Sequence, residues 1–394
     1  MKKTLAAVAV LGAFAGSALA ADVQLYGVVD TGLQYLHGDA DSNKAGVDSD
    51  FDSFSMESGM GSGSRFGFKG TEDLGNGLTV GFILEDGIKS DTGVDDDVLF
   101  NRESSLFLQG GFGKVAFGRI GSFNGGVSSW AKYGVMSVFG TSWGDYSAQA
   151  GTWAMGAGMW NNMIAYETPS FAGFKVFAQY GMGNQLKDKT DETTLVGEEN
   201  ESSSDRYYAI GASYNNGPLS LYFAVDSINY ASYGTGKDVD PNGDDSLTVT
   251  FGGNYDFEVV KLYAGAQYFD EIKRTKMKGV LQDVNDFNGG GFADRMKGWS
   301  LGVSAGIPVA GGTVMVGAAY LDAEAADSES SEATRRDDEL TRWIVSAGYD
   351  YPFSKRTDVY GVVTYNQDNL KFTGDHADQD PYVFGVMVGL RHKF

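Results

Sequence analysis

Few side chains in this sequence are of a type that supports catalysis or metal binding. The chain has no Cys and only three His, which are His37, His376 and His392. A nucleophilic enzyme needs a base beside its nucleophile, and a zinc site needs clustered Cys, His or carboxylate ligands. Neither pattern surrounds any of the three His residues. We therefore expect no catalytic residue, no metal site and no cofactor, and we predict that the chain is not an enzyme.

Arg65 and Lys69 are the charged pair with the most informative spacing, because they lie at positions i and i+4 of an alternating segment. Successive side chains of a strand point to opposite faces. Arg65 and Lys69 then share one face, and Phe66 and Phe68 share the other. Such a strand needs water on one face and an apolar environment on the other. Which environment Arg65 and Lys69 meet therefore depends on the fold of the whole chain.

The same period of two recurs from one end of the chain to the other. Segments 78–85, 174–180 and 312–322 alternate apolar residues with polar or small ones, and in 23–35 the apolar positions are mostly odd-numbered. Alternation of this kind is typical of strands with one apolar face and one polar face. We predict β-strands throughout the chain.

The connections between these strands alternate in length. Seven are short and rich in turn residues, and eight are long and mostly charged, which gives sixteen strands. Short and long connections never break this alternation, so all turns are expected at one end of a single domain and all loops at the other. The short turns are 72–77, 110–113, 169–173, 215–218, 255–258, 309–312 and 351–356, and the long loops lie near 37–60, 89–99, 121–160, 184–205, 231–245, 270–297, 322–339 and 368–380.

Composition agrees with an all-β chain. The 394 residues include 56 Gly, 6 Pro, 21 Tyr and 25 Phe, and this aromatic content is too high for a disordered linker. The formal net charge is −22, from 30 basic and 52 acidic side chains. Nucleic acids are therefore not expected as partners, because binding phosphate requires positive charge.

The N-terminus resembles a secretory signal. Lys2 and Lys3 precede an apolar stretch from Leu5 to Phe14, and Ala18-Leu19-Ala20 has the small-x-small pattern of a cleavage site. The apolar stretch is shorter than the roughly 20 residues that a membrane-spanning helix needs. We predict a signal peptide over residues 1–20 and one barrel domain over residues 21–394.

A secreted chain of sixteen alternating strands has two possible architectures. A soluble sandwich would gather its apolar faces in a closed core, and it gives no reason for turns to be sorted by length. A transmembrane barrel turns its apolar face to lipid, encloses water and leaves no unpaired strand edge. The last strand, 382–394, alternates up to a C-terminal Phe394, which resembles the assembly signal of outer-membrane barrels. We therefore predict a 16-stranded antiparallel transmembrane β-barrel in the bacterial outer membrane, in which Arg65 and Lys69 face the lumen.

The sequence resembles a known family, the trimeric general porins of Gram-negative bacteria, especially their neisserial and β-proteobacterial branch. The resemblance implies a homotrimer whose barrels are water-filled channels for passive diffusion of ions and small hydrophilic solutes. It also implies that the third long loop folds inward as a constriction, and that the outer-membrane assembly machinery inserts the chain. The matching stretches, in family order, are LYGVVDTGL (25–33), SRFGFKGTEDLGNGL (64–78), FNRESSLFL (100–108), FGKVAFGRI (112–120), YETPSFAGFKVFAQYG (166–181) and GLRHKF (389–394).

The third long loop, residues 121–160, differs from the acid-rich loops around it. It has a single acid, Asp145, and a single base, Lys132. It is rich in Gly and aromatic residues, and exposed aromatic residues in such number would favour aggregation. We therefore expect this loop inside the barrel, with Asp145 and the aromatic side chains of Trp130, Trp143 and Tyr146 at the constriction.

Two further arginines, Arg102 and Arg119, match family positions at which basic side chains line the wall opposite the constriction loop. With Arg65 and Lys69 they form the predicted basic wall. An alternative for each is an arginine that pairs with a wall carboxylate for stability. The chain has Met159 and Trp160 where the family usually has another basic residue, which weakens the case for anion selectivity. Four bases near one acid favour anions at the constriction, whereas the acidic loops favour cations outside it. Because the distant loop charges are screened first, the sequence predicts weak selectivity that shifts toward anions as salt rises.

The acidic loops leave two interpretations open. Runs such as Asp95-Asp96-Asp97 and Asp244-Asp245 repel one another unless they are solvated or bridged by cations. Divalent ions with oxygen ligands could link them to the phosphates of lipopolysaccharide among the outer-membrane lipids. The loops could also serve an adhesin or structural barrel with little conductance, which is the alternative to a porin.

Overall fold

We describe the protein from a computed structural model. The described residues are 22–39, 50–94, 98–140, 143, 149–154, 158–183, 199–232, 244–273, 293–327, 337–373 and 378–394. The predicted signal peptide lies outside them, so the domain boundary after Ala20 stays a prediction. Among the described helices, none is long and apolar enough to cross a membrane.

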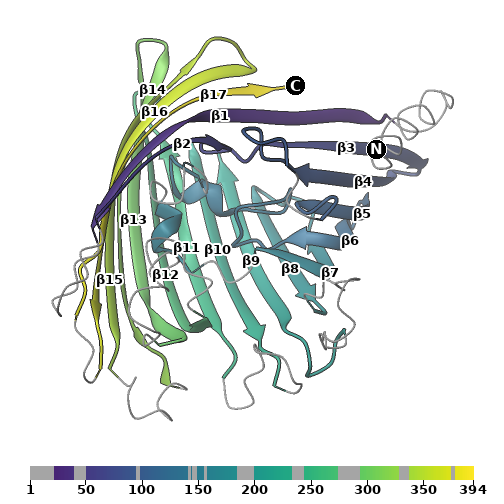
Figure 1. Ribbon diagram of the computed structural model, residues 1–394. Coiled ribbons are helices and arrows are strands. Elements are labelled where there is room, and N and C mark those ends of the chain that lie inside the picture. Colours follow the sequence, from purple (N-terminus) through teal and green to yellow (C-terminus); the bar gives the residue numbers. More distant parts are fainter. Residues whose placement is uncertain are drawn as a thin grey trace.

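The described chain is almost entirely antiparallel sheet (Figure 1). Two short 3-10 helices, η1 (Tyr133–Met136) and η2 (Gln149–Thr152), lie between β6 and β7. The strands are β1 (Gln24–Asp39), β2 (Phe51–Ser58), β3 (Arg65–Gly75), β4 (Leu78–Gly87), β5 (Glu103–Gly110), β6 (Gly113–Gly121), β7 (Met159–Glu167), β8 (Phe174–Gly181), β9 (Arg206–Asn216), β10 (Leu219–Asn229), β11 (Leu247–Asp256), β12 (Lys261–Lys273), β13 (Arg295–Val309), β14 (Gly312–Ala325), β15 (Glu339–Pro352), β16 (Thr357–Lys371) and β17 (Tyr382–Lys393).

The sheet closes on itself, because β1 pairs with β17 from Val28↔Lys393 to Asp39↔Tyr382. On its other side β1 pairs with β2 along one half and with β3 along the other. β2 and β3 are thus one barrel strand that residues 59–64 interrupt, and the seventeen segments form the sixteen predicted barrel strands. The sequence placed residues 51–58 in a loop; the structure places them in β2, because they continue the ladder with β1.

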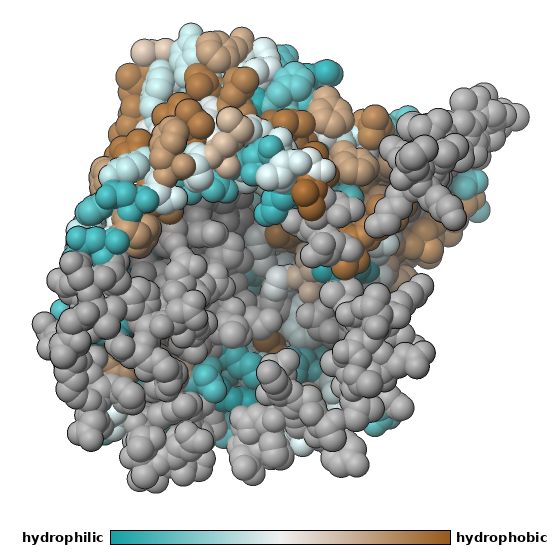
Figure 2. Space-filling view, viewed as in Figure 1, coloured by the Kyte–Doolittle hydropathy of each residue, from teal (hydrophilic) through white to brown (hydrophobic). Residues whose placement is uncertain are grey.

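The two faces of the barrel differ as the alternation predicts. Apolar side chains point outward along each strand, whereas buried polar and charged side chains gather on the inside. Figure 2 shows apolar residues in brown over the upper strands and hydrophilic residues in teal in the central hollow. Outward side chains include Leu25, Val29, Leu33, Leu106, Phe117, Ile210, Phe251, Leu301, Val303, Val345, Val388 and Leu390.

The C-terminal residue helps to close the barrel. The Phe394 and Gly27 backbones exchange two hydrogen bonds of 3.1 Å. A Cβ atom on Gly27 would come within 2.4 Å of the Phe394 ring, so glycine is the residue that leaves room for this ring. The predicted terminal strand therefore ends in contact with the first one.

Candidate functional site

We call the connection between β6 and β7, residues 122–158, L3. Its described residues, 122–140, 143, 149–154 and 158, lie inside the barrel (Figure 1). Within it, η1 lies against β10, β11 and β12, and η2 lies against β13, β14 and β15. Wall side chains bond its backbone: Asn254 Nδ2 donates to the Val135 carbonyl at 2.8 Å, and the Val138 N–H donates to Ser304 Oγ at 3.0 Å. L3 therefore follows the inner wall, and the predicted inward fold is confirmed.

The tryptophans in and beside L3 are buried. Exposed fractions are 2% for Trp130, 6% for Trp143, 1% for Trp153 and 2% for Trp160. The Tyr133 ring packs edge-on against Trp153, with 5.4 Å between ring centroids. Burial raises the pKa of the Tyr133 hydroxyl well above its ordinary value, so this group stays uncharged at neutral pH. The aromatic residues of L3 thus attach the loop to the wall.

A buried polar group anchors the start of L3. Asn124 Nδ2 donates to Asp226 Oδ2 of β10, and the Tyr222 hydroxyl donates to Asn124 Oδ1 at 2.6 Å. Beside it, the Phe123 N–H donates to Gln179 Oε1 of β8 at 3.0 Å. Since buried polar groups are costly without partners, these bonds specify where the loop leaves the wall.

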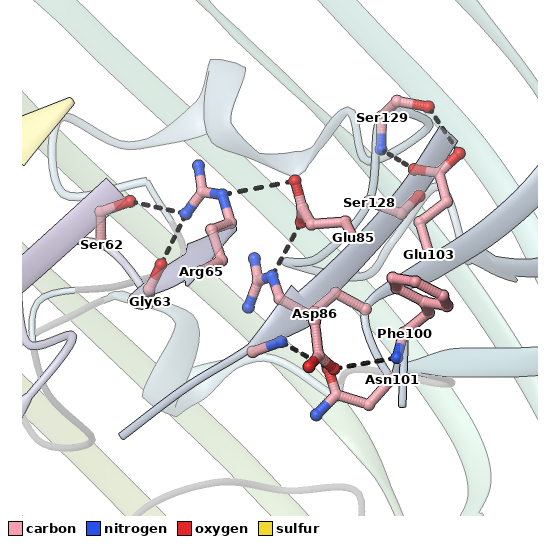
Figure 3. A network of polar contacts seen from close by, with 12 residues as sticks. Ser62, Gly63, Arg65, Glu85, Asp86, Phe100, Asn101, Glu103, Ser128 and Ser129 are labelled. Atoms are coloured by element: carbon pink, nitrogen blue, oxygen red, sulfur yellow. Dashed lines mark hydrogen bonds and ion pairs between the residues drawn. The ribbon is translucent and has the colours of Figure 1, made fainter. Parts of the chain in front are cut away.

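Two of the predicted wall bases, Arg65 and Arg102, meet at one carboxylate (Figure 3). Glu85 Oε1 lies 2.8 Å from Arg102 Nε, and Glu85 Oε2 lies 3.5 Å from Arg65 Nε. Arg65 Nη1 also donates to Ser62 Oγ at 3.1 Å and to the Gly63 carbonyl at 2.7 Å. Arg65, Arg102 and Glu85 together have a net charge of +1, which is less than the sequence alone suggested.

A second wall carboxylate, Glu103, holds L3 from the β5 side. It accepts hydrogen bonds from the Ser129 N–H at 2.8 Å and the Ser129 hydroxyl at 3.0 Å (Figure 3). It also accepts one from the Ser105 hydroxyl at 2.7 Å. Glu85 and Glu103 lie opposite each other in the β4–β5 register. The wall facing L3 is therefore a mixed arrangement of bases and acids.

A closed sixteen-stranded barrel with an inward third loop has a counterpart among known proteins. A family model described as Gram-negative porin matches residues 6–370 of this chain. The chain belongs to this porin family. It is an outer-membrane β-barrel channel, and nothing favours the adhesin alternative.

Relatives of this porin come from the bacterial groups that the sequence suggested. It is 34% identical over 415 residues to an outer membrane porin protein of Bordetella pertussis, covering 100% of both chains. It is 27% identical over 403 residues to the major outer membrane protein P.IB of Neisseria meningitidis, again covering 100% of both. Among solved structures, the anion-selective porin from Comamonas acidovorans matches with a TM-score of 0.64 at 27% identity, over 95% of this chain and 100% of that chain.

The other two predicted wall bases lie apart from the Glu85 group. Lys69 Nζ lies 5.0 Å from the centroid of the Tyr26 ring. Arg119 lies at a bulge of β6, where its Nε donates to the Asn101 carbonyl at 2.7 Å and its Nη1 donates to Asn161 Oδ1 at 2.5 Å. Their part in a common basic wall stays a prediction.

The predicted acid of L3, Asp145, and its neighbour Tyr146 lie outside the described residues. The single base of L3, Lys132, pairs with Glu167 of β7 at 3.1 Å. Glu167 also binds Lys175 of β8 at 2.6 Å. The sequence did not indicate this group, because it depends on the position that L3 takes along the wall.

Arg391 of β17 is a lumenal base that the sequence prediction missed. Its guanidinium lies 2.9 Å from Asp350 Oδ2 and 2.8 Å from Asp358 Oδ1, on the two preceding strands. It also lies 5.6 Å from the Trp143 ring of L3. The alternation of the last strand could have predicted this inward position, because Arg391 lies between the outward residues Leu390 and His392.

Residues 59–64 leave the barrel wall between β2 and β3 and are fixed by two wall side chains. Asp30 Oδ2 accepts a hydrogen bond from the Ser62 N–H at 2.6 Å. Asp30 Oδ1 accepts one from the Tyr360 hydroxyl at 2.6 Å, and the Gly61 N–H donates to that same hydroxyl at 3.0 Å. Side chains from β1 and β16 therefore hold this segment in place.

The same segment contacts L3. The Trp143 N–H donates to the Met60 carbonyl at 2.5 Å, and the Trp143 ring packs edge-on against Tyr360 with centroids 4.9 Å apart. Along the chain, L3 leaves β6, contacts β10 to β12 through η1, reaches β16 and residues 59–64 at Trp143, and then contacts β13 to β15 through η2. This path narrows the lumen of the porin on several sides.

A Tyr360→Phe variant is expected to lose about 1–3 kcal/mol of unfolding free energy, because Asp30 Oδ1 and the Gly61 N–H both lose a partner in a buried setting. Urea unfolding in lipid vesicles, monitored through the gel mobility of unheated samples, measures this loss of unfolding free energy. Tyr349→Phe is the matched control, since the exposed Tyr349 hydroxyl donates to carbonyls of a turn that water can solvate. Equal stabilities of the two variants would contradict the role given to Tyr360.

Proposed function

We propose that this porin lets ions and small hydrophilic solutes diffuse passively across the outer membrane, as a homotrimer and without catalysing a reaction. The observation that carries the proposal is L3, which lies inside the lumen and leaves charged side chains on the facing walls. Such an arrangement selects solutes by size and charge and needs no gate or reacting group. The family resemblance supports the trimer.

Opposing groups of charge support weak ion selectivity. Arg65 and Arg102 exceed Glu85 by one positive charge, whereas Asp350 and Asp358 exceed Arg391 by one negative charge. The acidic loops add negative potential at the channel entrance, and this distant contribution is screened first. The Debye length falls from about 10 Å at 0.1 M salt to about 3 Å at 1 M. We therefore propose that selectivity shifts toward anions as salt rises, in the direction of the related anion-selective porin from Comamonas acidovorans.

The proposed channel is tested by single-channel recording in planar bilayers. We expect each insertion event to open a steady current that closes in three equal steps, one for each barrel of a trimer. In a salt gradient, the reversal potential should lie near zero at low salt. At high salt it should move toward the reversal potential of an anion-selective channel. A folded protein that carries no current would favour a closed structural barrel, and single-step closure would argue against three independent channels.

Two external partners remain part of the proposal. Phe394, at the end of β17, is proposed as the signal that the outer-membrane assembly machinery recognises. Lipopolysaccharide bridged by divalent cations is proposed for the acidic loops. Of the acidic runs, Asp95-Asp96-Asp97 lies outside the described residues, and in the described pair Asp245 accepts two hydrogen bonds from Asn229 Nδ2, at 2.6 and 2.7 Å.

A further inference from the structure

A cavity of about 420 Å³ opens into the lumen between L3 and the wall. Its wall residues Tyr263, Thr313, Asp350 and Arg391 all lie near the short-turn ends of their strands, at the turns 256–261, 309–312 and 352–357 and beside the C-terminus. The cavity is thus on the turn side of L3, and it borders the Glu85 group at Ser62, whose hydroxyl accepts a hydrogen bond from Arg65 Nη1 at 3.1 Å.

Opposite charges line this cavity side by side. Arg391 Nη2 lies 2.9 Å from Asp350 Oδ2, and both side chains keep some exposure, 12% for Arg391 and 21% for Asp350. Neither group has used its full hydrogen-bonding capacity among the described residues. Arg391 Nη1 makes only a long contact of 3.4 Å to the Gly61 carbonyl. Asp350 Oδ1 is buried and accepts no hydrogen bond from any described residue, which leaves Oδ2, already 2.9 Å from Arg391 Nη2, as the carboxylate oxygen available to the cavity. A guanidinium has five N–H donors and a carboxylate about four acceptor positions.

Neutral polar groups form much of the remaining lining, beside the apolar side chains of Val138 and Met315. The hydroxyl residues Ser62, Ser137 and Thr313 line the cavity, together with backbone of Gly61 and Gly140. Such a surface suits a compact hydrophilic molecule better than an apolar one, because water removed from these groups must be replaced by hydrogen bonds. The aromatic residues nearby face mainly into packing contacts, since Trp143 is 6% and Phe139 is 1% exposed.

We infer that this cavity is a binding subsite for small polar zwitterions of the free α-amino acid class. One carbon separates the carboxylate and the ammonium of an amino acid, so the two groups can bridge an adjacent arginine and aspartate. The carboxylate binds Arg391, and the ammonium binds Asp350. The inference rests on the channel proposed above, because the solute reaches the cavity through the open lumen.

Net charge distinguishes this ligand from simpler ions. Arg391, Asp350 and Asp358 together have a charge of −1, and Arg65, which donates to the lining residue Ser62, adds one positive charge nearby. The charges are therefore mixed, and a lone anion leaves Asp350 without a cation of the solute. A lone cation leaves the free Arg391 donor without an acceptor and is repelled by the guanidinium. A zwitterion meets both charges and adds none of its own.

The test is the reduction of single-channel current, and its excess noise, by four probes of similar size. Serine has both charges and a hydroxyl, ethanolamine lacks the carboxylate, glycolate lacks the ammonium, and glycerol has neither. We expect serine to reach half-maximal reduction at a concentration about tenfold lower than any of the others. Ethanolamine equal to serine would indicate a cation site, and four equal probes would indicate no subsite; either result would overturn the inference.

An Asp350→Asn variant should abolish the preference for serine, because it removes the charge that holds the ammonium. Asp73→Asn is the matched control, since Asp73 lies exposed near the end of β3, where its carboxylate accepts a hydrogen bond from the Gly75 N–H at 2.8 Å. The control should keep the wild-type order of probes. Absence of any wild-type current would refute the proposed channel, whereas current without probe discrimination would refute the subsite alone. If the Asp350→Asn protein does not fold, the four-probe comparison on the wild type still decides.

Discussion

An Arg342→Met variant is expected to lose about 3–5 kcal/mol of unfolding free energy, because it leaves a buried carboxylate without its cation. Arg342 of β15 and Asp368 of β16 are both 0% exposed. They form two parallel hydrogen bonds of 2.6 Å, from Nε to Oδ1 and from Nη2 to Oδ2. Arg342 Nη1 also donates to the Gly151 carbonyl of L3 at 2.7 Å, so one side chain joins two strands and the constriction loop.

Urea unfolding in lipid vesicles measures this loss, and an exposed pair on the same two strands provides the control. Lys371 of β16 lies 2.5 Å from Glu339 of β15, with side chains 64% and 49% exposed. Lys371→Met should leave stability nearly unchanged, because water solvates both partners. The double variant Arg342→Met/Asp368→Leu should recover much of the loss, since it removes the uncompensated charge together with its partner. Equal losses from the two single variants would contradict the buried pair.

The Arg342→Met channel should also conduct differently. Without the donor to the Gly151 carbonyl, η2 loses one of its bonds to the wall, and L3 fluctuates more. We expect greater open-channel current noise than in the Lys371→Met channel. A destabilised barrel with unchanged noise would mean that this bond does not restrain L3.

The fold could be predicted from the sequence because its signals are local. Alternating side chains give the strands and their faces, and glycine-rich or Pro-containing turns give the connections. Sixteen strands in one barrel followed from these two patterns. The interruption at residues 59–64 could not be predicted, since it depends on Asp30 and Tyr360, which are far away in sequence and adjacent only after the barrel closes.

The candidate site could be predicted only in part. Alternation places Arg65 and Lys69 on the lumenal side, and the composition of residues 121–160 predicts an inward loop. Pairing partners require the strand register, however: Glu85 reaches Arg65 because β3 and β4 are neighbours, and Arg391 reaches Asp358 because β16 and β17 are. The sequence therefore indicated the lumenal bases Arg65 and Lys69, but it missed Arg391 and could not show which acids reduce the charge of these bases.

A double variant, Arg65→Gln/Arg102→Gln, is expected to shift the reversal potential toward cations. It leaves Glu85 as an unpaired anion beside L3, so the local charge changes from +1 to −1. One unit charge at 4 Å contributes about 1 kcal/mol even in bulk water, and about 1.4 kcal/mol corresponds to a tenfold change in local concentration. We expect the cation-to-anion permeability ratio to rise several-fold, most clearly at low salt.

Two comparisons separate this local effect from net charge. Lys355→Gln/Arg356→Gln also removes two positive charges, but from the exposed turn between β15 and β16, and it should move the reversal potential much less. Glu85→Gln should shift the potential the opposite way, because it leaves Arg65 and Arg102 unopposed. Equal shifts from the two double variants would mean that overall charge governs selectivity. The expected order instead places the control of ion selectivity at Arg65, Arg102 and the Glu85 carboxylate that they share, where the narrow lumen brings passing ions closest to unscreened charge.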